Sequence, residues 1–143
     1  MPARTRILTI AVVALVVIGG ALWFTRSANE ARAAHSIALG PNASVEPEPG
    51  ASVHVDGTTV GVSSGAARVY VGARGSTPAA TYTIETVAAT ATIAADATTH
   101  DVSVEVAPNG TMIRCTACGT PITAKAADGS THTVGNKQTL TLR

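Results

Sequence analysis

The chain has 143 residues and a formal net charge of +1, with ten Lys and Arg against nine Asp and Glu. This length fits one modest domain with appendages and excludes a large multidomain enzyme, while the balanced charge argues against an electrostatic nucleic-acid binder. Hydrophobic residues make up 45% of the chain but aromatic residues only 3%, so we expect a lightly filled core of Val, Ile and Ala beyond residue 34.

The first predicted element is a membrane-spanning helix over residues 7–25. Residues 7–24 carry no charged side chain, and Arg4 and Arg6 precede them. A helix of this length rises about 27 Å, close to the roughly 30 Å hydrocarbon core of a bilayer. Trp23 and Phe24 lie where aromatic side chains anchor a helix in the membrane interface. We therefore expect a cytoplasmic N-terminus at residues 1–6, an uncleaved signal anchor in the lipid bilayer, and an extracytoplasmic remainder.

Cleavage of the N-terminal segment is the alternative. The sequence Ala31-Arg32-Ala33 fits the small-x-small pattern, and a cut after Ala33 would release a secreted chain. The apolar run is long for a cleaved signal peptide, which favours the anchor.

Residues 26–50 are expected to form a spacer, or stalk, in front of a folded domain. This stretch contains Pro41, Pro47 and Pro49 and shows no helical periodicity. The short run at 36–39 could instead pair as an edge strand.

From residue 51 to residue 143 the sequence predicts an extracytoplasmic β domain. Val53, Val55, Val60 and Val62 alternate with polar residues around Asp56-Gly57, which predicts a hairpin that pairs 55 with 58 and 53 with 60. Further strands are expected at 67–72, 81–87, 89–94, 101–107 and 111–115, followed by a second Asp-Gly turn at 128–129. The predicted fold class is all-β, a small antiparallel β-sandwich, with an immunoglobulin-like or open-barrel arrangement as the alternatives.

Cys115 and Cys118 are the only cysteines of the chain, three positions apart in a predicted oxidising compartment. A local disulfide that stiffens a turn is the favoured interpretation. One alternative is a metal site, because Cys-x-x-Cys-Gly resembles half of a zinc ribbon, with His132 completing the ligands. A thiol redox centre and two free thiols also remain open, although no helix is predicted to lower a thiolate pKa.

No other motif predicts catalysis. Gly61 to Gly65 has the Gly-x-Ser-x-Gly spelling of a nucleophile elbow, but a strand rather than a helix is expected to follow Ser63. The histidines, His100 among them, show no metal-ligand spacing and are expected at the surface. Asp96 and Asp101 are expected in turns.

We therefore expect a non-catalytic accessory or interaction subunit of an envelope or membrane complex, with no cofactor and no nucleic-acid partner. Its partners would be the lipid bilayer and a protein in the membrane or envelope. An exported metal-binding or thiol-redox protein that uses Cys115 and Cys118 is the alternative. In layout alone the chain resembles small anchored β-proteins that accompany bacterial envelope transporters.

Overall fold

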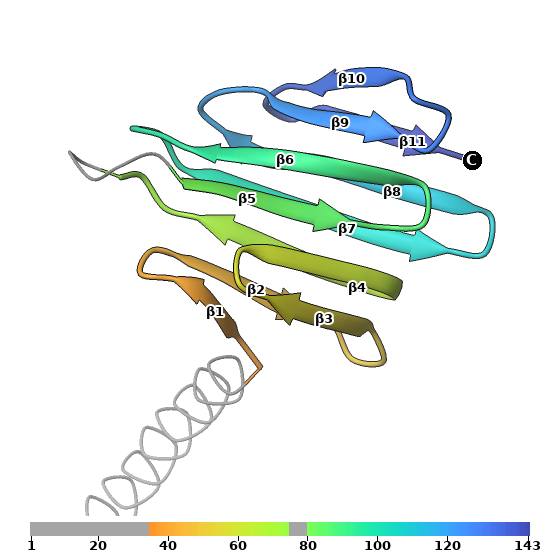
Figure 1. The fold of residues 1–143 in the computed structure, drawn as a ribbon, viewed down its shortest axis with the longest axis horizontal. Helices are drawn as coiled ribbons and strands as arrows, with labels where there is room; N and C mark the ends of the chain where they lie inside the picture. Colours follow the sequence, from red (N-terminus) through yellow and green to blue (C-terminus); the bar gives the residue numbers. More distant parts are fainter. Residues whose placement is uncertain (1–34, 75–79) are drawn as a thin grey trace, which may run out of the picture. The chain divides into compact units, whose positions relative to one another are not determined.

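A computed structural model describes residues 35–74 and 80–143 of the chain. Residues from Ser36 to Arg143 form one compact unit, which is all-β, with a mixed sheet nearly closed into a barrel (Figure 1). The predicted membrane span at 7–25, the N-terminus at 1–6 and the cleavage site after Ala33 lie outside the described residues. Within 35–74 and 80–143, no helix is long and apolar enough to cross a membrane.

The strands of the described residues follow one another with short connections. They are β1 (Ile37–Gly40), β2 (Ala43–Pro47), β3 (Ser52–Asp56), β4 (Thr59–Val71), β5 (Ala80–Glu85), β6 (Ala89–Ala95), β7 (His100–Ala107), β8 (Gly110–Cys118), β9 (Ile122–Ala126), β10 (Thr131–Val134) and β11 (Thr139–Leu142).

The strand order is β10-β9-β6-β5-β4-β7-β8-β11, with β3 and β2 also pairing with β4, and β1 with β2 (Figure 1). The two ends of this path, β10 and β11, come close to each other, which brings the sheet near closure. The open barrel is therefore a closer description of the fold than the favoured sandwich.

The expectation of a purely antiparallel sheet is wrong at one ladder. Residues 59–61 of β4 pair in parallel with residues 83–85 of β5. A parallel pair needs a long crossover connection. The second half of β4 provides most of that connection, because it leaves β5 and runs beside β2 and β7 instead.

The change of partners along β4 depends on Gly65, which has a φ of 78°. Before this residue Val60 and Val62 are buried, and after it Ala67 and Val69 are buried, so the inward-facing positions change from even to odd numbers. The face changes at Ser63, the extra residue of β4 between the pairs Val53–Val62 and Ser52–Ser64, and the positive φ of Gly65 adds a bend where the partners change. The predicted strands at 59–62 and 67–72 are thus one strand with a bend.

The first Asp-Gly turn forms a hairpin, but its register differs from the expected one. Val55 pairs with Val60 and Val53 with Val62, around a loop of Gly57 and Thr58. Gly57 has a φ of 57°, as the first central residue of a type II′ turn requires. Because the shift is two residues, each valine keeps the face that the alternation predicted.

Part of the expected spacer belongs to the folded unit. Residues 37–40 and 43–47 form β1 and β2, and β2 pairs with β4 from Ala43 to Pro47. Leu39 and Val45 lie buried in the core. The prolines suggested a spacer, yet Pro47 lies beyond the part of β2 that pairs with β1, so one side of the strand is unpaired there, as in an edge strand, where proline is tolerated.

The core has the predicted light composition. Its buried side chains are mostly Val, Ile and Ala, and Tyr82 is the largest of them.

Candidate functional site

The candidate site is the cysteine segment at the end of β8 and the polar groups around it. In a regular strand, residues three apart point to opposite faces and their Cα atoms lie roughly 10 Å apart. Here Cys115 pairs with Val102, and Ala117 pairs with Asp101, so Thr116 is an extra residue in β8. This β-bulge turns both cysteines inward.

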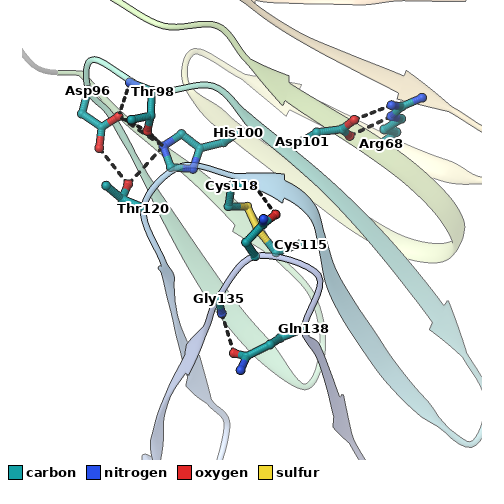
Figure 2. Close-up of a disulfide and its surroundings, with 11 residues drawn as sticks. Arg68, Asp96, Thr98, His100, Asp101, Cys115, Cys118, Thr120, Gly135 and Gln138 are labelled. Carbon is teal, nitrogen blue, oxygen red and sulfur yellow. Dashed lines mark hydrogen bonds and ion pairs between the residues drawn. A yellow bond between two sulfur atoms is a disulfide. The ribbon is translucent and has the colours of Figure 1, made fainter.

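The inward-facing cysteines meet as a pair (Figure 2). Their sulfur atoms lie at disulfide distance, and their Cα atoms are 5.9 Å apart, within the range that a disulfide requires. Cys115 is 0% exposed and Cys118 is 5% exposed. The structure therefore brings together the two residues that the sequence predicted as a disulfide, by means of a bulge that the spacing alone did not reveal.

A turn at residues 135–138 holds the bulge from the side of β11. The backbone N–H of Cys115 donates to the carbonyl oxygen of Gln138, and the N–H of Lys137 donates to the carbonyl oxygen of Cys115. The side-chain oxygen of Asn136 accepts from the N–H of Cys118 at 3.1 Å. The backbone groups of Cys115 and Cys118 that face away from β7 are thus satisfied by this turn.

His100, the first residue of β7, lies directly opposite Cys118. Its side chain is 1% exposed, which makes the expectation of a surface histidine wrong. The ring lies between the disulfide and a cluster of Asp96, Thr98 and Thr120 (Figure 2). His100 is buried because it continues the inward alternation of β7 at the first position of the strand.

All the polar neighbours of His100 gather at one ring nitrogen. Nε2 lies 3.3 Å from the hydroxyl oxygens of Thr98 and Thr120 and 3.4 Å from Oδ1 of Asp96. The other nitrogen, Nδ1, is buried without a hydrogen-bond partner. Every polar contact of the ring is therefore made on the side of Nε2, which faces Asp96 and the two threonines.

Asp96 is the acceptor at the centre of the cluster. The Thr98 hydroxyl donates to Oδ1 at 2.5 Å, the Thr98 N–H donates to the same atom at 2.8 Å, and the Thr120 hydroxyl donates to Oδ2 at 2.7 Å. These hydrogen bonds, that of the Thr98 hydroxyl first, hold the pKa of Asp96 well below its ordinary value.

The cluster does not have the geometry of a catalytic relay. A His general base has its nucleophile on one ring nitrogen and its orienting carboxylate on the other. In this cluster the hydroxyl groups and the carboxylate share Nε2. What the arrangement does is tie residues 96–100, at the start of β7, to the segment that follows Cys118.

His132, the third ligand of the alternative metal site, lies on β10 opposite Ala124. Its Nε2 is 2.9 Å from the hydroxyl of Ser130, which in turn donates to Asp128. Within the described part of the chain, no three His, Cys, Asp or Glu side chains are placed to hold a metal ion. The structure thus gives Cys115, Cys118 and His132 no common site.

Ser63, in the sequence that resembles a nucleophile elbow, lies in the bend of β4. Its hydroxyl donates to the carbonyl oxygen of Ser52 at 3.3 Å. The expected strand after this motif is present, and the second glycine of the motif, Gly65, is explained by its positive φ.

Asp96 lies in the connection between β6 and β7, as expected, whereas Asp101 lies in a strand rather than in the expected turn. Asp101 lies in β7 with its side chain 10% exposed, and Nε of Arg68 donates to Oδ1 at 2.7 Å. A second guanidinium nitrogen contacts Oδ2, so the pair is bidentate. The hydrogen bond and the charge of Asp101 raise the pKa of Arg68.

The outer face above these residues is hollowed. A shallow cavity of about 420 Å³ is bordered by Glu48, Glu105, Met112 and Arg114, with Gly65 on its lining. A second one of about 230 Å³ is lined by Ser44, Glu46, Arg68 and Tyr70.

Comparisons of this chain with protein families, curated proteins and solved structures find no match.

Proposed function

We propose that the chain is a single-pass, membrane-anchored protein whose β unit acts outside the cytoplasm as a non-catalytic interaction subunit of an envelope or membrane complex. The apolar N-terminal run supports the anchor, because its length matches a bilayer. The cysteine pair supports the compartment, since stable structural disulfides form where the environment is oxidising.

The residue composition of one outer face supports the proposed contact with a protein partner. Glu46, Arg68, Ser103 and Arg114 face outward in register on β2, β4, β7 and β8. Tyr70 and Met112 flank this row and are 45% and 37% exposed. Tyr, Arg and Met are the residue types that protein interfaces favour. We call the surface formed by these six residues the grooved face.

The opposite side of the unit provides a contrast. Its outer surface carries Thr83, Thr92, Thr123 and Thr133 directly opposite one another on β5, β6, β9 and β10. Such a row offers small side chains without charges or large apolar groups. The grooved face is therefore the better candidate for contact with a protein partner.

Site-specific photo-crosslinking tests this proposal. A photoreactive phenylalanine derivative replaces Met112 in the full chain in its native membrane, and Thr92 carries it in a matched control. We expect a discrete crosslinked protein from position 112 and none from position 92. Arg114→Glu should abolish the position-112 adduct because it reverses a charge at the cavity. Equal adducts from both positions, or none from either, would contradict the proposed face.

A further inference from the structure

The bulge at Thr116 gives β8 two possible arrangements against β7. In the observed one, Cys115 and Cys118 point inward and Ala117 is exposed. Without the extra residue, strict alternation would leave Cys115 inward, turn Ala117 inward and turn Cys118 outward. Thr116 faces outward in both arrangements. The two states therefore differ by the exchange of Ala117 and Cys118 at one inward position.

The covalent bond favours the bulged arrangement. Two bonded sulfur atoms lie about 2.05 Å apart, whereas unbonded heavy atoms separate to roughly 3.5–4.0 Å. Both side chains are buried, so two thiols would crowd the core at the end of β8. Ala117 is small and apolar, and it fits an inward position without a polar group to satisfy.

The neighbouring turn at residues 135–138 also favours straightening of β8 once the disulfide is reduced. Lys137, whose N–H donates to the carbonyl oxygen of Cys115, has a φ of 60°. This left-handed conformation is unfavourable for a residue with a side chain, and it can relax when Cys118 turns outward, because the N–H of Cys118 then leaves the side-chain oxygen of Asn136 in the same turn.

We propose that the Cys115–Cys118 disulfide is a redox-sensitive clasp, a bond that holds β8 in the bulged arrangement. Reduction by a dithiol straightens β8 and turns Cys118 outward and Ala117 inward. It also loosens the turn at 135–138. A thiolate of the dithiol attacks Sγ of Cys118, because Cys118 is 5% exposed and Cys115 0% exposed. The Cys115 thiolate leaves and takes a proton from water. The second thiolate of the dithiol then attacks the dithiol sulfur that is bonded to Cys118. This step releases the Cys118 thiolate and leaves the dithiol oxidised.

Alkylation of the full chain tests the clasp. Protein purified without reductant should be two hydrogens lighter than its fully reduced form. After reduction with dithiothreitol, iodoacetamide should label Cys118 faster than Cys115 by roughly tenfold or more, because only Cys118 becomes exposed. Amide exchange should accelerate at 116–118 and 135–138 and remain unchanged in β5 and β6.

Two matched variants separate the clasp from general loosening. Ala117→Asp leaves the oxidised state intact, because Ala117 is exposed there. After reduction, the charged side chain opposes the rotation of residue 117 into the core. Labelling of Cys118 should therefore fall back to the rate of Cys115. Thr116→Asp faces outward in both states and should leave the labelling ratio unchanged. Equal labelling of the two thiols, protection of both, or the same ratio in Ala117→Asp and the unaltered chain would overturn the proposal.

Discussion

Lys137 carries an unusual backbone conformation for its residue type. Its φ of 60° is the only positive value at a non-glycine residue within 35–74 and 80–143. We expect Lys137→Gly to raise the free energy of unfolding by roughly 0.5–1 kcal/mol, because relief of the left-handed strain exceeds the added entropy of the unfolded chain. Urea unfolding measures the difference. Lys137→Ala removes the charge but keeps the Cβ atom, so it should give no gain; an equal gain from both variants would contradict the explanation.

Asp96 predicts a pH dependence at the acidic end. Its pKa is depressed in the folded state by the hydroxyl of Thr98 first and that of Thr120 second. A depressed carboxyl pKa contributes stability above the unfolded value of about 3.9 and loses it as pH falls through the folded value. The urea midpoint of the unaltered chain should therefore drop below about pH 4.

Asp96→Asn should flatten part of this acidic decline, because the amide cannot titrate. The pKa of Asp128 is also depressed, by hydrogen bonds from Ser130, so Asp128→Asn serves as the comparison. It should leave the Asp96 contribution in place. An Asp96→Asn protein whose midpoint falls with pH as steeply as the unaltered chain would refute the role of this carboxylate.

At the residue scale, the sequence predicted the pairing of Cys115 with Cys118 but neither its geometry nor its neighbours. His100 was expected at the surface because its sequence context, two threonines and an aspartate, is typical of turns. Whether such a residue lies inward depends on the position at which β7 begins. That position is fixed by pairing with Cys118 on a different strand, which local sequence does not encode.

At the scale of the element, the bend of β4 offers a sharp test. A Cβ atom added at Gly65 would lie 2.7 Å from the Cα of Ala51, and the φ of 78° disfavours any side chain. We expect Gly65→Ala to cost roughly 3 kcal/mol or more, since backbone strain and overpacking each contribute roughly 1–3 kcal/mol.

Gly129 provides the control for the bend. It has a φ of 89° but nothing within 4 Å of an added Cβ, so Gly129→Ala should cost only the strain of about 1–2 kcal/mol. Chemical denaturation of both variants gives the comparison. Similar losses at the two positions would show that the close approach to Ala51 has no energetic weight.

Strand positions were predictable because alternating valines are a local signal, as at Val102 and Val104. The partners of the strands were harder to predict. A two-residue shift in the hairpin of β3 and β4 leaves every side chain on its predicted face, so burial alone could not distinguish the two registers. Gly57 has a positive φ in either register, as the second loop residue of a type I′ turn or the first of a type II′ turn, so this glycine does not select between them.

At the scale of the whole molecule, the bend of β4 determines the architecture. One strand pairs with β3 and β5 in its first half and with β2 and β7 in its second. It thereby joins the ladder that carries the threonine row to the ladder that carries the grooved face. The sequence predicted an all-β unit, but it could not predict the parallel ladder, because the extra residue at Ser63 and the bend at Gly65 that redirect β4 leave no mark in the local alternation.

We propose that an N-terminal anchor holds this β unit outside the cytoplasm. Paired reporter fusions after Arg143 test it most directly in cells that make the full chain. Alkaline phosphatase becomes active only outside the cytoplasm. A green fluorescent protein fused to a chain that uses the general secretion pathway becomes fluorescent only if it stays in the cytoplasm. The proposal predicts an active, membrane-bound phosphatase fusion and a dark fluorescent fusion. A fluorescent fusion together with an inactive phosphatase would contradict it.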